Sequence, residues 1–191
     1  MSADRQGGAR ADAAVLRQRA SWRWRGDQRP PFATAPGPGQ ESVWDYPRPP
    51  RVEFDDRRVR VAVGGVMIAE SRRCQRVLET ASPPTFYLPP DDVDPDALVP
   101  TKRSSFCEWK GQAVYWSVRI GSRLLEAVAW SYPDPFPEFV GLKGYIAFYP
   151  HRLACSVAGA RVEPQPGDFH AGWVTPEVVG PFKGEPDSED W

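Results

Sequence analysis

The chain has 191 residues, a length that allows one domain with extensions rather than two full domains. Apolar residues make up 41% of it and charged residues 26%, which excludes disorder of the whole chain. The formal net charge is −1, so no overall field attracts nucleic acid, an anionic membrane or an acidic substrate. No stretch is apolar over the length of a membrane span, and the N-terminus lacks the apolar core of a signal peptide. We therefore expect a cytoplasmic protein that binds neither nucleic acid nor membranes.

Proline accounts for 22 residues, roughly twice its usual share of ~5%, so long helices are not expected. Residues 10–20 alone combine helix-forming composition with about three turns of length. The two ends of the chain differ in charge: residues 1–29 hold seven arginines and three aspartates, whereas residues 184–191 hold four acidic residues and no basic one. Screening favours two solvated, independent tails over pairing of the tails within the chain or between subunits.

A first hairpin is predicted around Gly64-Gly65, because alternating valines precede this pair and an apolar run follows it. Antiparallel pairing places Val63 opposite Val66 and Val61 opposite Ile68, which gives one continuous apolar face.

A second hairpin is predicted around Gly121-Ser122. Its pairing sets Val118 against Leu125, Trp116 against Ala127 and Val114 against Ala129 on one apolar face. The other face carries Tyr115, Ser117, Glu126, Val128 and Trp130, with Trp130 diagonal to Tyr115. This second face would line a cleft or meet solvent.

Further short strands are predicted at residues 77–80, 86–88, 144–149, 153–157 and 160–163, the last two joined through Ala158-Gly159. Prolines such as Pro83-Pro84 and Pro89-Pro90 lack backbone donors and indicate connections or sheet edges. Strands this short need two layers or a closed barrel to bury a core. The sequence thus predicts a mostly β fold: a small, curved, antiparallel sheet with a short N-terminal helix.

Neither a metal nor another cofactor is expected. The potential soft ligands Cys74, Cys107, Cys155, His151 and His170 are too far apart for zinc-ligand spacing, so we expect reduced thiols and no stoichiometric zinc. The acidic run Asp91, Asp92, Asp94 and Asp96 lacks the glycine and terminal glutamate of a calcium loop and is typical of a solvated turn or a helix cap.

Phosphate-binding motifs are missing from the sequence. It contains no Walker loop and no Gly-x-Gly-x-x-Gly. A polymerase-type nucleotidyltransferase would place Gly-Ser ahead of an Asp-x-Asp pair, but here Asp94 and Asp96 precede Gly121-Ser122.

The best candidate for chemistry is the segment from Cys107 to Gly111, which places a thiol, a carboxylate, an indole and an ammonium together. Lys110 would favour the thiolate of Cys107 and activate it as a nucleophile, so these two are the candidate catalytic residues. The alternative is that Cys107 is a small buried hydrophobe and that Lys110 extends from a sheet edge.

Aromatic residues make up 12% of the chain, and most of them must be core. A few around a cleft of mixed polarity would suit a flat or cationic small ligand. The candidate ligand-binding residues are Glu79, Tyr87, Trp109, Tyr115, Trp130, Tyr132 and Tyr149. The sequence Trp22-Arg23-Trp24-Arg25 would stack on single-stranded nucleic acid or pack on its own domain, and we favour packing.

Several motifs together resemble one bacterial family. They are Val77-Leu78-Glu79-Thr80, the run Pro83 to Pro89, Cys107-Glu108-Trp109-Lys110-Gly111, Ala129-Trp130-Ser131-Tyr132-Pro133 and Gly144 to Tyr149. The chain resembles the family known as domain of unknown function 427 over residues 20–191. The resemblance implies a folded-over sheet like the β-tent of methionine sulfoxide reductase B, here without paired zinc ligands. The family also carries the label nucleotidyltransferase-like.

We therefore expect an N-terminal extension over residues 1–50 that packs on the domain, a β domain over residues 51–165, and a C-terminal extension with an acidic tail over residues 166–191. The leading hypothesis is a domain that binds a small molecule, with or without transforming it, between residues 107–111 and 130–133. The alternatives are a nucleotidyltransferase, as the family label suggests, and a non-catalytic domain that binds protein partners through its proline-rich loops and its oppositely charged termini.

Overall fold

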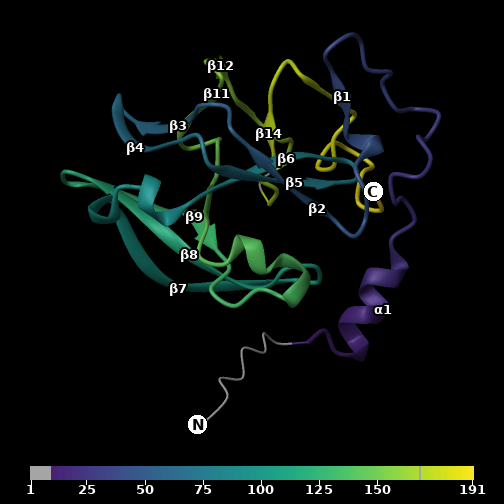
Figure 1. The fold of residues 1–191 in the computed structure, drawn as a ribbon, viewed down its shortest axis with the longest axis horizontal. Helices are drawn as coiled ribbons and strands as arrows, with labels where there is room; N and C mark the ends of the chain where they lie inside the picture. Colours follow the sequence, from purple (N-terminus) through teal and green to yellow (C-terminus); the bar gives the residue numbers. More distant parts are fainter. Residues whose placement is uncertain (1–9, 168) are drawn as a thin grey trace.

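Antiparallel β-sheets dominate the computed structural model, which describes residues 10–167 and 169–191 (Figure 1). The largest sheet pairs, in spatial order, β2 (Arg51–Asp55), β5 (Cys74–Glu79), β6 (Ser82–Leu88), β10 (Ile146–Phe148), β9 (Arg123–Ser131), β8 (Gly111–Ile120) and β7 (Leu98–Cys107). A four-stranded sheet has the order β12 (Ala160–Arg161), β11 (Ala154–Val157), β3 (Val59–Val63) and β4 (Val66–Ser71). The described residues form no closed barrel.

Smaller elements complete the structure. Strand β1 (Glu41–Ser42) pairs in parallel with β15 (Val178–Val179), and β13 (Glu163–Pro164) pairs antiparallel with β14 (Trp173–Val174). Short 3-10 helices are η1 (Val43–Asp45), η2 (Pro90–Asp92), η3 (Pro95–Ala97) and η4 (Pro137–Leu142). The helix α1 (Ala13–Ser21) is capped by the Asp12 carboxylate, which accepts from the backbone N–H groups of Ala14 and Val15. The predicted mostly β class with a short N-terminal helix is confirmed.

The β3–β4 hairpin turns at Gly64 and Gly65 as predicted, and both glycines have positive φ, as a type I′ turn requires. Val63 lies opposite Val66, also as predicted. The expected pairing of Val61 with Ile68 is wrong, because a β-bulge shifts the register and places Ala69 opposite Val61.

The β8–β9 hairpin turns at Gly121 as predicted, and Val118 lies opposite Leu125. Beyond that pair the predicted register is wrong: Trp116 lies opposite Ala129 rather than Ala127, and Val114 opposite Ser131 rather than Ala129.

The cause lies in an irregularity at Ala127, which has a positive φ of 50° and donates its N–H to Ser117 Oγ at 3.1 Å. As a result Val128, predicted on the mixed face, packs in the main core, and Ala127 packs on the side of the aromatic residues. Tyr115 then lies directly opposite Trp130 rather than diagonal to it.

The sequence does not predict two strands of the large sheet, β2 and β7. Strand β7 contains Pro100 and has no buried residue, so it lacks the apolar alternation that marks a strand. Strand β2 has only one buried residue, Asp55.

Pro83 and Pro84 lie near the start of β6. This part of β6 has no partner on β10, since β10 pairs only with Tyr87 and Leu88.

The large sheet buries side chains on both faces. On β6, Phe86 and Leu88 belong to the main core shared with the four-stranded sheet, while Tyr87 between them belongs to a second cluster on the opposite face. On β10, Phe148 and Ala147 divide in the same way. This alternation follows from the two-residue period of a strand. The second cluster is the one that carries the candidate site.

The two extensions pack on each other and on the domain through a third cluster. Trp44 is fully buried there, with its ring 5.7 Å from Trp24 and 5.2 Å from both Phe32 and Trp191. The C-terminal segment is therefore not the free tail that its charge predicted, because Trp191 anchors it. The first nine residues, which hold part of the basic N-terminal segment, lie outside the described residues.

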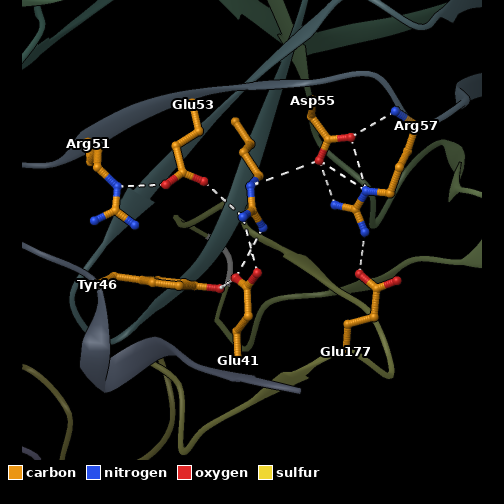
Figure 2. Close-up of polar contacts among 8 residues, drawn as sticks. Glu41, Tyr46, Arg51, Glu53, Asp55, Arg57 and Glu177 are labelled. Atoms are coloured by element: carbon orange, nitrogen blue, oxygen red, sulfur yellow. Dashed lines mark hydrogen bonds and ion pairs between the residues drawn. The ribbon is translucent and has the colours of Figure 1, made fainter. Parts of the chain in front are cut away.

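Ion pairs tie the same extensions to the edge strand β2 (Figure 2). Arg76 on β5 bridges Glu41 of β1 and Glu53 of β2, and Arg57 joins Asp55 to Glu177 before β15. Burial would raise the pKa of Glu41, but the hydrogen bonds from Arg76 and then Tyr46 outweigh burial and lower it. These contacts hold β1 and β15 against the edge of the large sheet.

Candidate functional site

A cavity of about 450 Å³ lies on the second face of the large sheet. All nine candidate residues line it: Cys107, Lys110, Glu79, Tyr87, Trp109, Tyr115, Trp130, Tyr132 and Tyr149. They come from β5 to β9, from the β7–β8 turn and from the residues that directly follow β9 and β10, so the sheet brings together residues that are up to 70 positions apart in the chain. Their roles stay predictions.

The β7–β8 turn positions Trp109 and Lys110. Cys107 ends β7 and pairs with Gly111, whose φ of 94° lies in the region that favours glycine. From outside the turn, Arg19 of α1 donates to the carbonyl oxygens of Glu108 at 2.6 Å and Trp109 at 3.2 Å. The N-terminal helix therefore helps to hold the conformation of the turn that carries the candidate chemistry.

Aromatic side chains form the wall of the cavity along β6, β8 and β9. Trp130 Nε1 donates to the Tyr87 hydroxyl at 3.3 Å, and the Tyr149 ring lies 4.8 Å from the Trp130 ring. Burial raises the pKa of Tyr87 to about 12, so this phenol stays protonated at neutral pH. The aromatic wall therefore presents apolar ring faces, and its polar groups, such as the Tyr87 phenol and the Trp130 indole N–H, carry no charge.

Lys110 is a buried cation in this cavity. Its residue is only 8% exposed, its ammonium has the Cys107 thiol as a hydrogen-bonding neighbour, and no carboxylate of the described residues forms an ion pair with it. Nζ lies about 6 Å from the rings of Tyr132 and Phe139. Burial lowers the pKa of Lys110, but the nearby Cys107, Tyr87 and Glu79 outweigh it and raise the pKa above its ordinary value. The ammonium therefore stays charged.

The neighbouring Trp109 Nε1 is buried without a hydrogen-bond partner, the only such side-chain atom among the described residues. A buried donor left unpaired costs free energy, and such groups often mark functional sites.

The thiol of Cys107 is half-buried and lines the cavity, whereas Cys74 and Cys155 are buried in the main core. The cavity thus gives Cys107 access that the other two cysteines lack. Glu108, which follows it, accepts a hydrogen bond from Trp22 Nε1 at 2.8 Å.

Another part of the cavity lining is polar and charged. Glu79 pairs with Arg48 at 3.1 Å, and the Arg48 side chain is 0% exposed. Trp22 lies between two cations, with Arg48 Cζ 4.2 Å and Lys183 Nζ 4.0 Å from its ring. Burial and then Arg48 lower the pKa of Lys183 to about 8.

Sequence reasoning missed the part of the cavity that the extensions build. Gln18 and Trp22 come from the N-terminal extension, His170 and Lys183 come from the C-terminal one, and Gln165 lies at the junction between the domain and the C-terminal extension. From the sequence, Trp22 is predicted only as part of an arm that packs on the domain. The C-terminal residues carry no local pattern that marks them as site residues.

Possible metal ligands do not gather within the described ranges, since no three His, Cys, Asp or Glu side chains form a group that would hold an ion. Asp94 caps η3 by accepting from the Asp96 N–H at 3.0 Å, as the helix-cap interpretation predicted, and neither residue lines the cavity. The Asp-x-Asp pair is thus separate from the candidate site.

Comparisons with known proteins identify the family. No curated protein matches the chain. None of the helices in the described part of the chain is long and apolar enough to cross a membrane. A family model described as a domain of unknown function (DUF427) matches residues 51–159, more than half of the sequence. The chain therefore belongs to the DUF427 family, as its motifs predicted.

Proposed function

We propose that the cavity binds a small planar molecule that carries a carboxylate or a comparable anionic group. The observation that carries the proposal is Lys110, a charged ammonium that is 8% exposed, lines the cavity and forms no ion pair with a carboxylate of the described residues. A buried charge without a counter-ion is costly, so such groups are normally paired. An anionic ligand supplies the counter-ion.

The carboxylates around the cavity do not fill this role. Glu79 pairs with Arg48, and Glu108 accepts from Trp22 Nε1. A buried ammonium without a carboxylate partner favours an anionic ligand over the cationic one that the aromatic residues alone would also suit.

The walls set the shape of the ligand. Tyr87, Trp130 and Tyr149 present ring faces and edges, which suit a flat molecule by stacking. The volume of about 450 Å³ falls within the ~300–1,000 Å³ of small-molecule sites.

Isothermal titration calorimetry with three naphthalene probes tests the proposal. 2-Naphthoate is planar and anionic, 2-naphthylmethanol is neutral and 2-naphthylmethylamine is cationic. We expect 2-naphthoate to bind at least about tenfold more tightly than the other two, since a charge-assisted contact is worth ~1.5–3 kcal/mol. Lys110→Met should remove this preference.

Lys102→Met is the matched control, because Lys102 is exposed and lies outside the cavity, so the same charge is lost without contact to the site. Equal binding of the three probes, preferred binding of the amine, or a preference that survives Lys110→Met would each contradict the proposal.

A further inference from the structure

A second pocket of about 130 Å³ adjoins the main cavity, and we call it the annex. Its lining residues are Arg103, Glu126, Ala127, Tyr149, His151, Arg152 and Phe169, and two of these, Tyr149 and Phe169, also line the main cavity. The Tyr149 ring lies 4.8 Å from Trp130 in the main cavity and 5.3 Å from His151 in the annex. The two pockets therefore share the Tyr149 ring as a common wall.

The annex carries an excess of hydrogen-bond donors with positive charge. Arg103 lies with Cζ 4.7 Å from the Tyr115 ring, and among the described residues its guanidinium makes no hydrogen bond or ion pair. Arg152 makes one hydrogen bond among the described residues, in which Nη1 donates to the Glu126 carbonyl oxygen at 3.2 Å. The one carboxylate, Glu126, is exposed to solvent and does not pair with either arginine.

We propose that the annex binds a phosphate group of the same ligand whose planar anionic part occupies the main cavity, an inference that rests on the proposed function. The planar guanidinium groups of Arg103 and Arg152 present several N–H donors in the geometry that phosphate oxygens accept. His151 adds a further donor. The ligand class is therefore a planar carboxylate that also carries a phosphomonoester.

The annex has the size for this group. Its volume is a few times the ~30 Å³ that one water molecule occupies in the liquid, which leaves room for a phosphate beside the side chains. The planar part of the ligand would occupy the larger main cavity, where the aromatic walls lie.

The test compares 6-hydroxy-2-naphthoate with its 6-phosphate ester by calorimetry on the full chain. We expect the ester to bind at least about tenfold more tightly, since it adds charge-assisted hydrogen bonds. Arg103→Met keeps aliphatic packing on Tyr115 but removes the guanidinium, and it should reduce the advantage of the ester to about twofold or less. Lys102→Met, on the same strand, should leave the advantage unchanged.

Glu126→Gln provides a test in the opposite direction. Removing this carboxylate from the annex should tighten the ester about twofold and leave 6-hydroxy-2-naphthoate unaffected. Inorganic phosphate should compete with the ester and not with 6-hydroxy-2-naphthoate, which separates the phosphate subsite from the planar subsite.

The outcomes distinguish the two proposals. If 6-hydroxy-2-naphthoate binds but the ester gains nothing, or if Arg103→Met leaves the gain intact, the annex proposal is wrong and the proposed function stands. If neither compound binds, the proposed function fails and the annex proposal fails with it.

Discussion

Trp22 Nε1 donates a hydrogen bond to Glu108 Oε1 at 2.8 Å, and this contact joins the N-terminal extension to the turn that carries Cys107 and Lys110. Trp22 lies outside the residues that the family model matches, while Glu108 lies within them. The cavity is thus built by the family domain together with this chain's own extensions. Ligand selectivity in this protein should depend on both.

The three cysteines should differ in reactivity. We expect iodoacetamide to modify Cys107 at least about tenfold faster than Cys74 or Cys155, because Cys107 alone lines the cavity. Burial raises the pKa of Cys74 to about 12 and also raises that of Cys155, which keeps both as thiols. Peptide mass spectrometry after brief labelling measures the three rates. Bound 2-naphthoate should slow labelling of Cys107, and modification of Cys107 only after unfolding would support the packing interpretation instead.

Lys110 should contribute to binding rather than to stability. The fold buries this ammonium without a carboxylate partner, so Lys110→Met should leave the free energy of unfolding unchanged or raise it by about 1 kcal/mol. Urea denaturation measures the change. A loss of about 2 kcal/mol or more would show that the ammonium has a structural role and would argue against the ligand site.

The Arg48–Glu79 pair should stabilise the fold. Glu79→Gln leaves a guanidinium that is 0% exposed without its charge partner, and we expect a loss of about 2 kcal/mol in the free energy of unfolding. Glu163→Gln is the matched control, because its ion pair with Arg161 is exposed and should contribute less than about 0.5 kcal/mol. Similar losses in the two variants would refute a buried role for this pair.

The affinity for an anionic probe should fall as the pH rises through about 8. Lys183 lines the cavity, and with its pKa lowered to about 8 it is largely charged at pH 7 and largely neutral at pH 9. Losing this charge weakens attraction for an anion, so we expect 2-naphthoate to bind about twofold to threefold more weakly at pH 9 than at pH 7. Lys110, whose pKa is raised, keeps its charge over this range.

Lys183→Met should flatten this pH profile while leaving most of the affinity at pH 9. Calorimetric titrations of the wild type and of Lys183→Met at pH 7, 8 and 9 check this prediction. A wild-type profile that stays flat, or a step that persists in Lys183→Met, would assign the pH dependence to another group.

The sequence by itself determined the local features of this protein. The turns at Gly64-Gly65 and Gly121-Ser122 follow from glycine's access to positive φ, and the mostly β class follows from short alternating runs between prolines. The family motifs identified the domain, and the segment from Cys107 to Gly111 lies at the cavity. Each of these features depends on residues that are near one another in the chain.

Tertiary structure decided the rest, because it depends on contacts between residues that are far apart. The hydrogen bond from the Ala127 N–H to Ser117 Oγ accompanies the register shift that places Tyr115 opposite Trp130, and no periodic pattern encodes such a shift. Aromatic packing around Trp44 brings the two extensions together and completes the cavity with Trp22 and Lys183. That Lys110 is charged, buried and without a carboxylate partner there is a property of its surroundings, which a lysine in a sequence does not reveal.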